Sequence, residues 1–188
     1  LRGQRWPVVG LDVGGIAHGF GRQAELKFRT IVEGKLKMGY DAVTFGADDL
    51  RLPAGELLSV AAGVDGQPSP FLSANVGLFG FDAGLTAKTR IIEAAGMKIG
   101  VAGVLGKQFQ SEIHNNEIEM ADPETALKNV VPELKKKAGF LVLLANATMQ
   151  ESIELGKKFP EFNVVVAAGG PPEPPAPPKK IEGANPRV

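Results

Sequence analysis

The sequence predicts an α/β fold, a layered sandwich in which buried mixed β-sheets are flanked by helices. Short apolar runs such as 140–145 (FLVLLA) and 163–168 (NVVVAA) are typical of strands that are buried on both faces. Segments with helical spacing of apolar residues alternate with these runs, and glycine or proline marks most junctions. This alternation favours sheets whose faces are covered by helices.

Turn residues and apolar spacing define the elements of the N-terminal half. Apolar residues along 22–38 indicate an amphipathic helix, and Gly39 is a suitable C-cap because glycine readily adopts the left-handed conformation. Pro53 suits the first turn of a second helix, which extends to Ala62 before a break at Gly63, Gly66 and Pro68. The predicted strands of this half are 6–13, 42–45 and 70–76.

The C-terminal half begins with two apolar runs, 89–95 and 97–105, which Gly96 separates and which predict a hairpin. Residues 107–121 show no clear period and are expected to be irregular. Beyond the next helix, further strands are predicted at 140–145 and 163–168, with a short helix between them at 150–159.

The best-defined helix starts at Asp122, a suitable N-cap that is followed by Pro123 in the first turn. Three lysines at 135–137 end the helix, where positive charge complements the helix dipole, so this charge run is not interpreted as a binding patch. Pro132 lies within the helix and is able to kink it. Six prolines in 171–178 predict an extended, polyproline-type segment, either a spacer or an interaction ligand.

Composition excludes several classes of function. The 188 residues carry 21 basic and 21 acidic side chains, and this balance gives no electrostatic reason to expect a nucleic acid or an anionic membrane as partner. The absence of cysteine excludes disulfides, thiolate zinc sites and a cysteine nucleophile. No apolar run is long enough for a membrane span, and no secretory signal is visible. The chain starts at Leu1, so the domain expected at 1–170, ahead of a proline-rich segment at 171–188, can be a fragment truncated at its N-terminus.

Chemistry is expected in the loops that follow the strands, because ligands of α/β sheets bind beyond the C-terminal strand ends. Asp48 and Asp49 lie in one such loop and could hold Mg²⁺ or Ca²⁺ together with Asp12 and Asn146. The alternative is that the two adjacent acids form a solvated turn or a helix N-cap ahead of Pro53. The loops concerned are 14–21, 46–52, 145–149 and 169–173.

Other residues with reactive side chains have simpler interpretations. His18 and His114 have no His or Cys partner at ligand spacing and are interpreted as polar surface residues. The glycines at 14, 15, 19 and 21 match no phosphate-binding motif. Three serines lack a recognisable nucleophile elbow: Ser73, Ser111 and Ser152.

Short motifs that occur in order along nearly the whole chain resemble the N-terminal catalytic domain of the calcineurin-like metallophosphoesterases, in their 5'-nucleotidase-like branch. Each motif alone is weakly specific, whereas the order and spacing of all the motifs together are moderately specific. The segment 45–49 (FGADD), for example, is similar to the turn that the family writes Gly-Asn-His-Glu. The other matching segments are 11–15 (LDVGG), 38–44 (MGYDAVT), 73–76 (SANV), 98–105 (KIGVAGVL), 143–146 (LLAN) and 163–170 (NVVVAAGG).

The resemblance implies a two-metal phosphoesterase site, but most positions of its ligands have changed. Gly15 stands where the family has a bridging Asp, Ala47 replaces an amide ligand, and Asp48 replaces an imidazole. Asn146 replaces a His ligand, and 171–173 (PPE) follow the glycines after which the family has its last histidines. The family's first Asp-(x)-His motif would lie upstream of Leu1. Neutral Gly, Ala and Pro side chains cannot coordinate a cation, so degenerate metal motifs are expected.

The sequence therefore predicts a degenerate, non-catalytic 5'-nucleotidase-like domain that requires no cofactor and acts as a structural or interaction module. The resemblance implies an extracytoplasmic or periplasmic location and another protein or domain as partner, with a multihaem cytochrome as one candidate. One alternative is a phosphoesterase that uses Mg²⁺, Mn²⁺ or Ca²⁺, with metal ligands Asp12, Asp48 and Asp49 and catalytic candidates Asp48 and Asn146. A second alternative is a module that binds a nucleotide or another small molecule.

Overall fold

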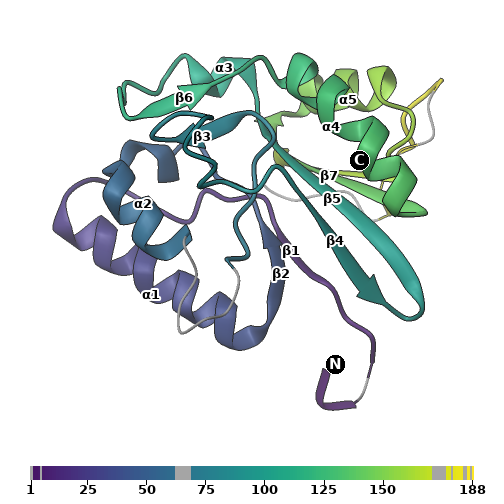
Figure 1. Cartoon of the computed structure of the whole chain (residues 1–188), viewed down its shortest axis with the longest axis horizontal. Coiled ribbons are helices and arrows are strands. Elements are labelled where there is room, and N and C mark those ends of the chain that lie inside the picture. The colour runs from purple at the N-terminus through teal and green to yellow at the C-terminus, as the bar shows by residue number, and fades with distance from the viewer. Residues whose placement is uncertain are drawn as a thin grey trace.

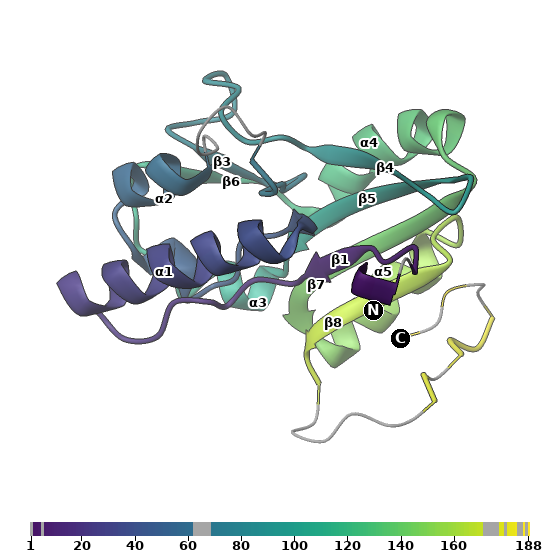
Figure 2. The ribbon, with the colours of Figure 1, turned by 90° about the horizontal axis from the view of Figure 1, so that it is seen from below.

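The computed structural model describes residues 2–4, 6–61, 69–170, 177–178, 180–183, 186 and 188. The described chain forms four layers, in which the larger sheet and the β1-β2 pair are stacked between two layers of helices (Figures 1 and 2). Helices α1 (Arg22–Met38) and α2 (Ala54–Ala61) cover one side, and α4 (Pro123–Lys137) and α5 (Met149–Lys158) cover the other. The predicted class, an α/β sandwich with buried mixed sheets flanked by helices, is confirmed.

The strands form one larger sheet and two short pairs. The larger sheet has the order β4-β5-β7-β8, with β4 antiparallel to β5 and the other pairs parallel. A parallel pair, β1-β2, is extended by a bridge from Val43 to Phe71, and an antiparallel pair is formed by β3 and β6. The strands are β1 (Gly10–Asp12), β2 (Tyr40–Val43), β3 (Val76–Leu78), β4 (Thr89–Ala94), β5 (Met97–Leu105), β6 (Ile118–Met120), β7 (Phe140–Thr148) and β8 (Val164–Gly169).

The helices begin and end largely where local signals place them. Gly39 closes α1 in the left-handed conformation, and its N–H binds the carbonyl of Leu36. Thr148 caps α5 by accepting a hydrogen bond from Glu151 N. Pro132 lies inside α4, which nevertheless continues to Lys137. The helices are η1 (Arg2–Gln4), α1 (Arg22–Met38), η2 (Asp49–Arg51), α2 (Ala54–Ala61), α3 (Lys107–Gln110), α4 (Pro123–Lys137) and α5 (Met149–Lys158).

Three hydrophobic clusters fill the spaces between the layers. Phe28 of α1 and Leu57 of α2 pack on one face of the β1-β2 sheet, and Leu127 of α4 packs on the outer face of the larger sheet. Val142 and Leu144 of β7 face the cluster between the sheets, while the alternate residues of β7 face α4 and α5. The burial of β7 on both faces explains its unbroken apolar sequence.

The helix predicted at 22–38 and the hairpin predicted from 89 to 105 are confirmed. Three other expectations need correction. The strand predicted at 6–13 is restricted to Gly10–Asp12, and Trp6 is largely exposed. The strand predicted at 70–76 contains only isolated bridges before β3 begins at Val76. The excursion at 107–121 is not wholly irregular, because it contains α3 and β6.

Some predicted segments fall outside the described residues, including the break at 62–68 and the first six residues of the proline tract. Among the helices that the structure describes, none combines the length and the apolar character that crossing a membrane requires.

The N-cap of α4 leads to a testable pH dependence. The Asp122 carboxylate accepts hydrogen bonds from the N–H and the hydroxyl of Thr125 at 2.8 and 2.9 Å, and it pairs with Lys107 Nζ at 2.5 Å. The Lys107 ammonium and then the Thr125 N–H lower the pKa of Asp122 from 3.8 to about 2. A lowered pKa in the folded state stabilises the fold above the ordinary pKa, and this stabilisation is lost as the pH falls toward 2.

We expect Asp122→Ala to destabilise the domain by about 1 kcal/mol at pH 7, the usual cost of losing an N-cap. The difference in the free energy of unfolding between the variant and the unchanged protein should become smaller at pH 3, where the stabilisation from the lowered pKa of Asp122 is partly lost. Urea unfolding at both pH values measures this difference. Asp122→Asn is the control, because asparagine caps helices about as well as aspartate but cannot pair with Lys107. An equal cost of Asp122→Ala at both pH values would contradict the assignment.

Candidate functional site

The loops after β1 and β2 meet at the C-terminal ends of these strands, where chemistry was expected. The backbones of Gly14 and Gly46 approach so closely that a Cβ atom on Gly14 would lie 2.3 Å from Gly46 N. Gly14 also has a φ of 77°, a conformation that L-residues rarely adopt. These glycines permit a turn-to-turn contact that leaves no room for side chains between the two loops.

Asp49 holds the two loops together. Its Oδ1 accepts hydrogen bonds from Ile16 N at 2.7 Å and Ala17 N at 2.8 Å, and its Oδ2 accepts from Gly15 N and Gly46 N, both at 2.8 Å. The residue is 0% exposed. A carboxylate offers about four lone-pair positions, and four N–H donors occupy them. Asp49 is therefore a structural clamp, because it binds main-chain N–H groups of both loops.

Burial raises the pKa of Asp49 above its ordinary value. The four N–H donors act in the opposite direction, because they stabilise the charged carboxylate.

Asp12 faces a cation from its own chain. Its Oδ2 pairs with Nζ of Lys35 from α1, and its Oδ1 accepts a hydrogen bond from Gly14 N at 2.8 Å. The Lys35 side chain is only 12% exposed, and its ammonium lies 4.7 Å from the centre of the Tyr40 ring. A divalent cation bound at Asp12 would have to approach this nearly buried ammonium, which is electrostatically unfavourable.

Asp48 points away from the clamp formed by its neighbour. Its side chain is 46% exposed and pairs with Arg51 at 3.2 Å, and Arg51 also pairs with Glu112 at 3.0 Å. Asp48 precedes the short helix η2, but its side chain makes no capping hydrogen bond. The solvated turn that the sequence offered as an interpretation describes Asp48. Asp49 is buried and is therefore not part of a solvated turn.

Asn146 at the end of β7 joins the two sheets. Its Nδ2 donates to the Val13 carbonyl at 2.8 Å, and its Oδ1 accepts from Ala47 N at 3.3 Å. The amide is nearly buried and both of its ends are bound to main chain. Asn146 therefore links the end of β7 to the loops that follow β1 and β2.

The four candidate ligands lie in the same region, at the C-terminal ends of β1, β2 and β7. Each of these ligands has partners within the protein: Asp12, Asp48, Asp49 and Asn146. In the ranges that the structure describes, no group of three or more His, Asp or Glu side chains lies close enough together to hold a metal ion. His18 is exposed in the glycine loop, and residues 171–173 lie outside the described ranges.

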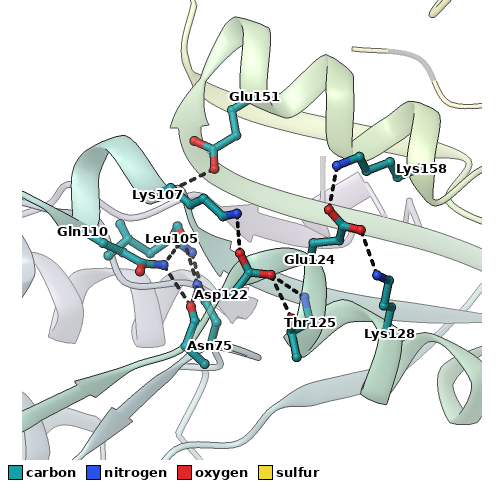
Figure 3. A network of polar contacts seen from close by, with 11 residues as sticks. Asn75, Leu105, Lys107, Gln110, Asp122, Glu124, Thr125, Lys128, Glu151 and Lys158 are labelled. Atoms are coloured by element: carbon teal, nitrogen blue, oxygen red, sulfur yellow. Dashed lines mark hydrogen bonds and ion pairs between the residues drawn. The ribbon is translucent and has the colours of Figure 1, made fainter.

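A second polar cluster, which sequence reasoning did not assign, follows the ends of β5 and β7 (Figure 3). Asn75 is fully buried, and its amide accepts from Leu105 N at 2.9 Å and donates to the Leu105 carbonyl at 2.8 Å, as a neighbouring strand would. Gln110 donates to the same Leu105 carbonyl and to that of Ala121. A buried amide inside the run SANV is a signal for such a bridge, because buried polar groups need partners.

Ion pairs continue this cluster across the helices. Glu124 of α4 pairs with Lys128 at 2.8 Å and with Lys158 of α5 at 2.6 Å, while Glu151 accepts from Lys107 N at 2.8 Å (Figure 3). The two lysines lower the pKa of Glu124 to about 2. These contacts join α3, α4 and α5, and every charge in them has a partner, so they are typical of a structural network.

The four layers and the mixed sheet are an arrangement that solved structures share. Solved structures with the same arrangement include a 5'-nucleotidase precursor from Thermus thermophilus, with a TM-score of 0.70 and 20% identity over 87% of this chain and 32% of that one. The NAD nucleotidase of Haemophilus influenzae matches with a TM-score of 0.67 and 17% identity over 85% of this chain and 32% of that one. A calcineurin-like phosphoesterase from Bacillus subtilis matches with a TM-score of 0.59 and 16% identity, over 85% of this chain and 57% of that one.

The chain therefore has the fold of the metallophosphoesterase superfamily, and in particular that of the 5'-nucleotidase-like N-terminal domain, which confirms the resemblance seen in the motifs. It spans about a third of the length of the two nucleotidases. No protein-family model matches the sequence, and no curated protein matches it.

Proposed function

We propose that this chain is a degenerate, non-catalytic 5'-nucleotidase-like domain that serves as a structural or interaction module of a larger protein or complex. The observation that carries the proposal is the pairing of every candidate carboxylate with groups of the chain itself. Lys35 neutralises Asp12, Arg51 pairs with Asp48, and backbone N–H groups occupy Asp49. A two-metal site needs anionic ligands that are directed at the metals, and these carboxylates are directed elsewhere.

The positions that the resemblance assigns to metal ligands support the same proposal. Ala47 has no donor atom in its side chain, and Asn146 uses both ends of its amide on main-chain groups. Gly15 has a φ of 76°, so an aspartate at this position would be strained. The donor set therefore does not fit a pair of divalent metals.

The names of the similar structures describe those proteins and not this chain. The words nucleotidase and phosphoesterase in these names refer to the matched proteins. The two nucleotidases are about three times as long as the region that matches this chain. An extracytoplasmic location and a protein partner are part of the proposal and rest on the resemblance.

Metal analysis combined with a hydrolysis assay tests the proposal. We expect the protein, after incubation with Mn²⁺ and desalting, to retain far less than one metal ion per chain by mass spectrometry. We also expect no release of phosphate from nucleoside monophosphates above the rate in buffer. Both results follow from the lack of anionic ligands that are directed at a common point.

Two variants make the result decisive. Asp48→Ala removes the most exposed of the candidate ligands, while Glu93→Ala removes an exposed acid at the far end of the β4–β5 hairpin. Stoichiometric metal and turnover that Asp48→Ala abolishes and Glu93→Ala preserves would overturn the proposal in favour of a phosphoesterase with an altered metal site. Stabilisation of the fold by a nucleotide without hydrolysis would favour a binding module.

A further inference from the structure

An open groove of about 570 Å³ is lined by Arg51, the ion-pair partner of Asp48. Leu50, Arg51 and Pro53 form one wall, and Glu112 together with residues 114–117 of the excursion forms the other. Asn115 fixes the two walls relative to each other, because its Nδ2 donates to the Leu52 carbonyl at 3.2 Å. A volume of this size lies in the range of ligand sites.

Phe20 borders the groove and is unusually exposed. Its side chain is 77% exposed, more than any other large apolar residue in the ranges that the structure describes. Gly19 and Gly21 flank it with φ angles of 83° and 76°, and the loop from residue 18 to residue 21 is exposed throughout. An exposed ring at the mouth of a groove offers a face on which an apolar group or a cation can be placed.

The charges around the groove are predominantly negative. Glu112 and Glu117 line it, whereas Arg51 is the one guanidinium and His114 the one imidazole among the lining residues. Arg51 pairs with Asp48 and with Glu112, so one guanidinium faces two carboxylates while the exposed Glu117 adds a third. An excess of carboxylates beside an exposed ring favours a ligand that is cationic and partly apolar.

We propose that this groove binds a basic, extended segment of a partner protein, in which lysine or arginine alternates with apolar residues. Cationic side chains would pair with Glu112 and Glu117, and an apolar side chain or stem would pack on Phe20. The exposed Asn116 amide can bond to the main chain of an extended peptide. The inference rests on the proposed role as an interaction module, because it names the chemistry of the partner.

A labelled peptide of sequence Lys-Leu-Lys-Leu-Lys, blocked at both ends, tests the inference by fluorescence anisotropy in buffer that contains EDTA. We expect saturable binding, and we expect the double variant Glu112→Gln with Glu117→Gln to weaken it about tenfold, as for the loss of two exposed ion pairs. Phe20→Ala should weaken it as well. Amide chemical shifts measured during titration should change at residues 50–52 and 112–117.

The control variant is Glu93→Gln, which removes an acid outside the groove and should leave the affinity unchanged. Equal binding of Glu-Leu-Glu-Leu-Glu, an equal loss in the control variant, or shift changes away from the groove would overturn the inference. Binding of N-acetyl-lysine amide with the same affinity as the peptide would also overturn it, because the site would then recognise a single cation. Because EDTA removes divalent metals, the result of the peptide-binding experiment does not depend on the result of the metal and hydrolysis assay.

Discussion

Replacing Asp49 with alanine is expected to destabilise the domain by about 4 kcal/mol or more. The substitution leaves four N–H groups without their acceptor in a region closed to water, and each buried, unpaired donor costs at least about 1 kcal/mol. A domain of ordinary stability would lose a large fraction of its free energy of unfolding. Urea denaturation, with the midpoint and slope compared between the proteins, measures the loss.

The adjacent Asp48 provides the matched control. Asp48→Ala removes the same side chain from an exposed position that has one ion pair with Arg51, so its cost should stay below about 1 kcal/mol. Asp49→Asn should remain costly, because an amide NH₂ would face two N–H donors that need an acceptor. Equal stability of the two alanine variants would show that the clamp does not hold the loops together.

The second large effect is expected for Gly14→Ala. The positive φ of Gly14 costs a residue with a Cβ about 1–2 kcal/mol, and the contact with Gly46 N adds overpacking of about 1–3 kcal/mol. We therefore expect a loss of about 3 kcal/mol or more in the free energy of unfolding. Thermal unfolding followed by circular dichroism measures it.

Gly19→Ala separates the two contributions. Gly19 has a φ of 83°, but a Cβ there would meet no atom within 4 Å. This variant should therefore show the conformational cost alone, about 1–2 kcal/mol. If Gly14→Ala is no worse than Gly19→Ala, the close approach of the two loops makes no contribution to stability.

Local signals predicted the elements that local interactions determine. The spacing along 22–38 and the C-cap Gly39 are contained in the sequence of the helix itself, as is the turn at Gly96 between two apolar runs. The strands β3 and β6 have three residues each and no period, and they are held by pairing between segments about forty positions apart. Such pairing produces no recognisable pattern within a few consecutive residues, which explains why β6 was not predicted.

The candidate site shows the same limit. Asp48 and Asp49 are identical neighbours in the sequence, yet one is solvated and the other is fully buried. What distinguishes them is a set of N–H groups at residues 15–17, more than thirty positions earlier. The absence of a donor atom in the Ala47 side chain is evident from the sequence, whereas the cation that pairs with Asp12 could not be predicted, because Lys35 approaches from a helix.

The hydrogen bond from Asn146 to Val13 joins residues that are 133 positions apart. Contacts of such long range form only after a large loss of chain entropy, so they slow folding. The ends of β1, β2 and β7 meet at this amide, and the N-terminal third therefore completes its packing only after β7 has been synthesised. Folding during translation is consequently expected to finish late, and a nascent chain that ends before β7 should be digested by proteases far faster than the full chain.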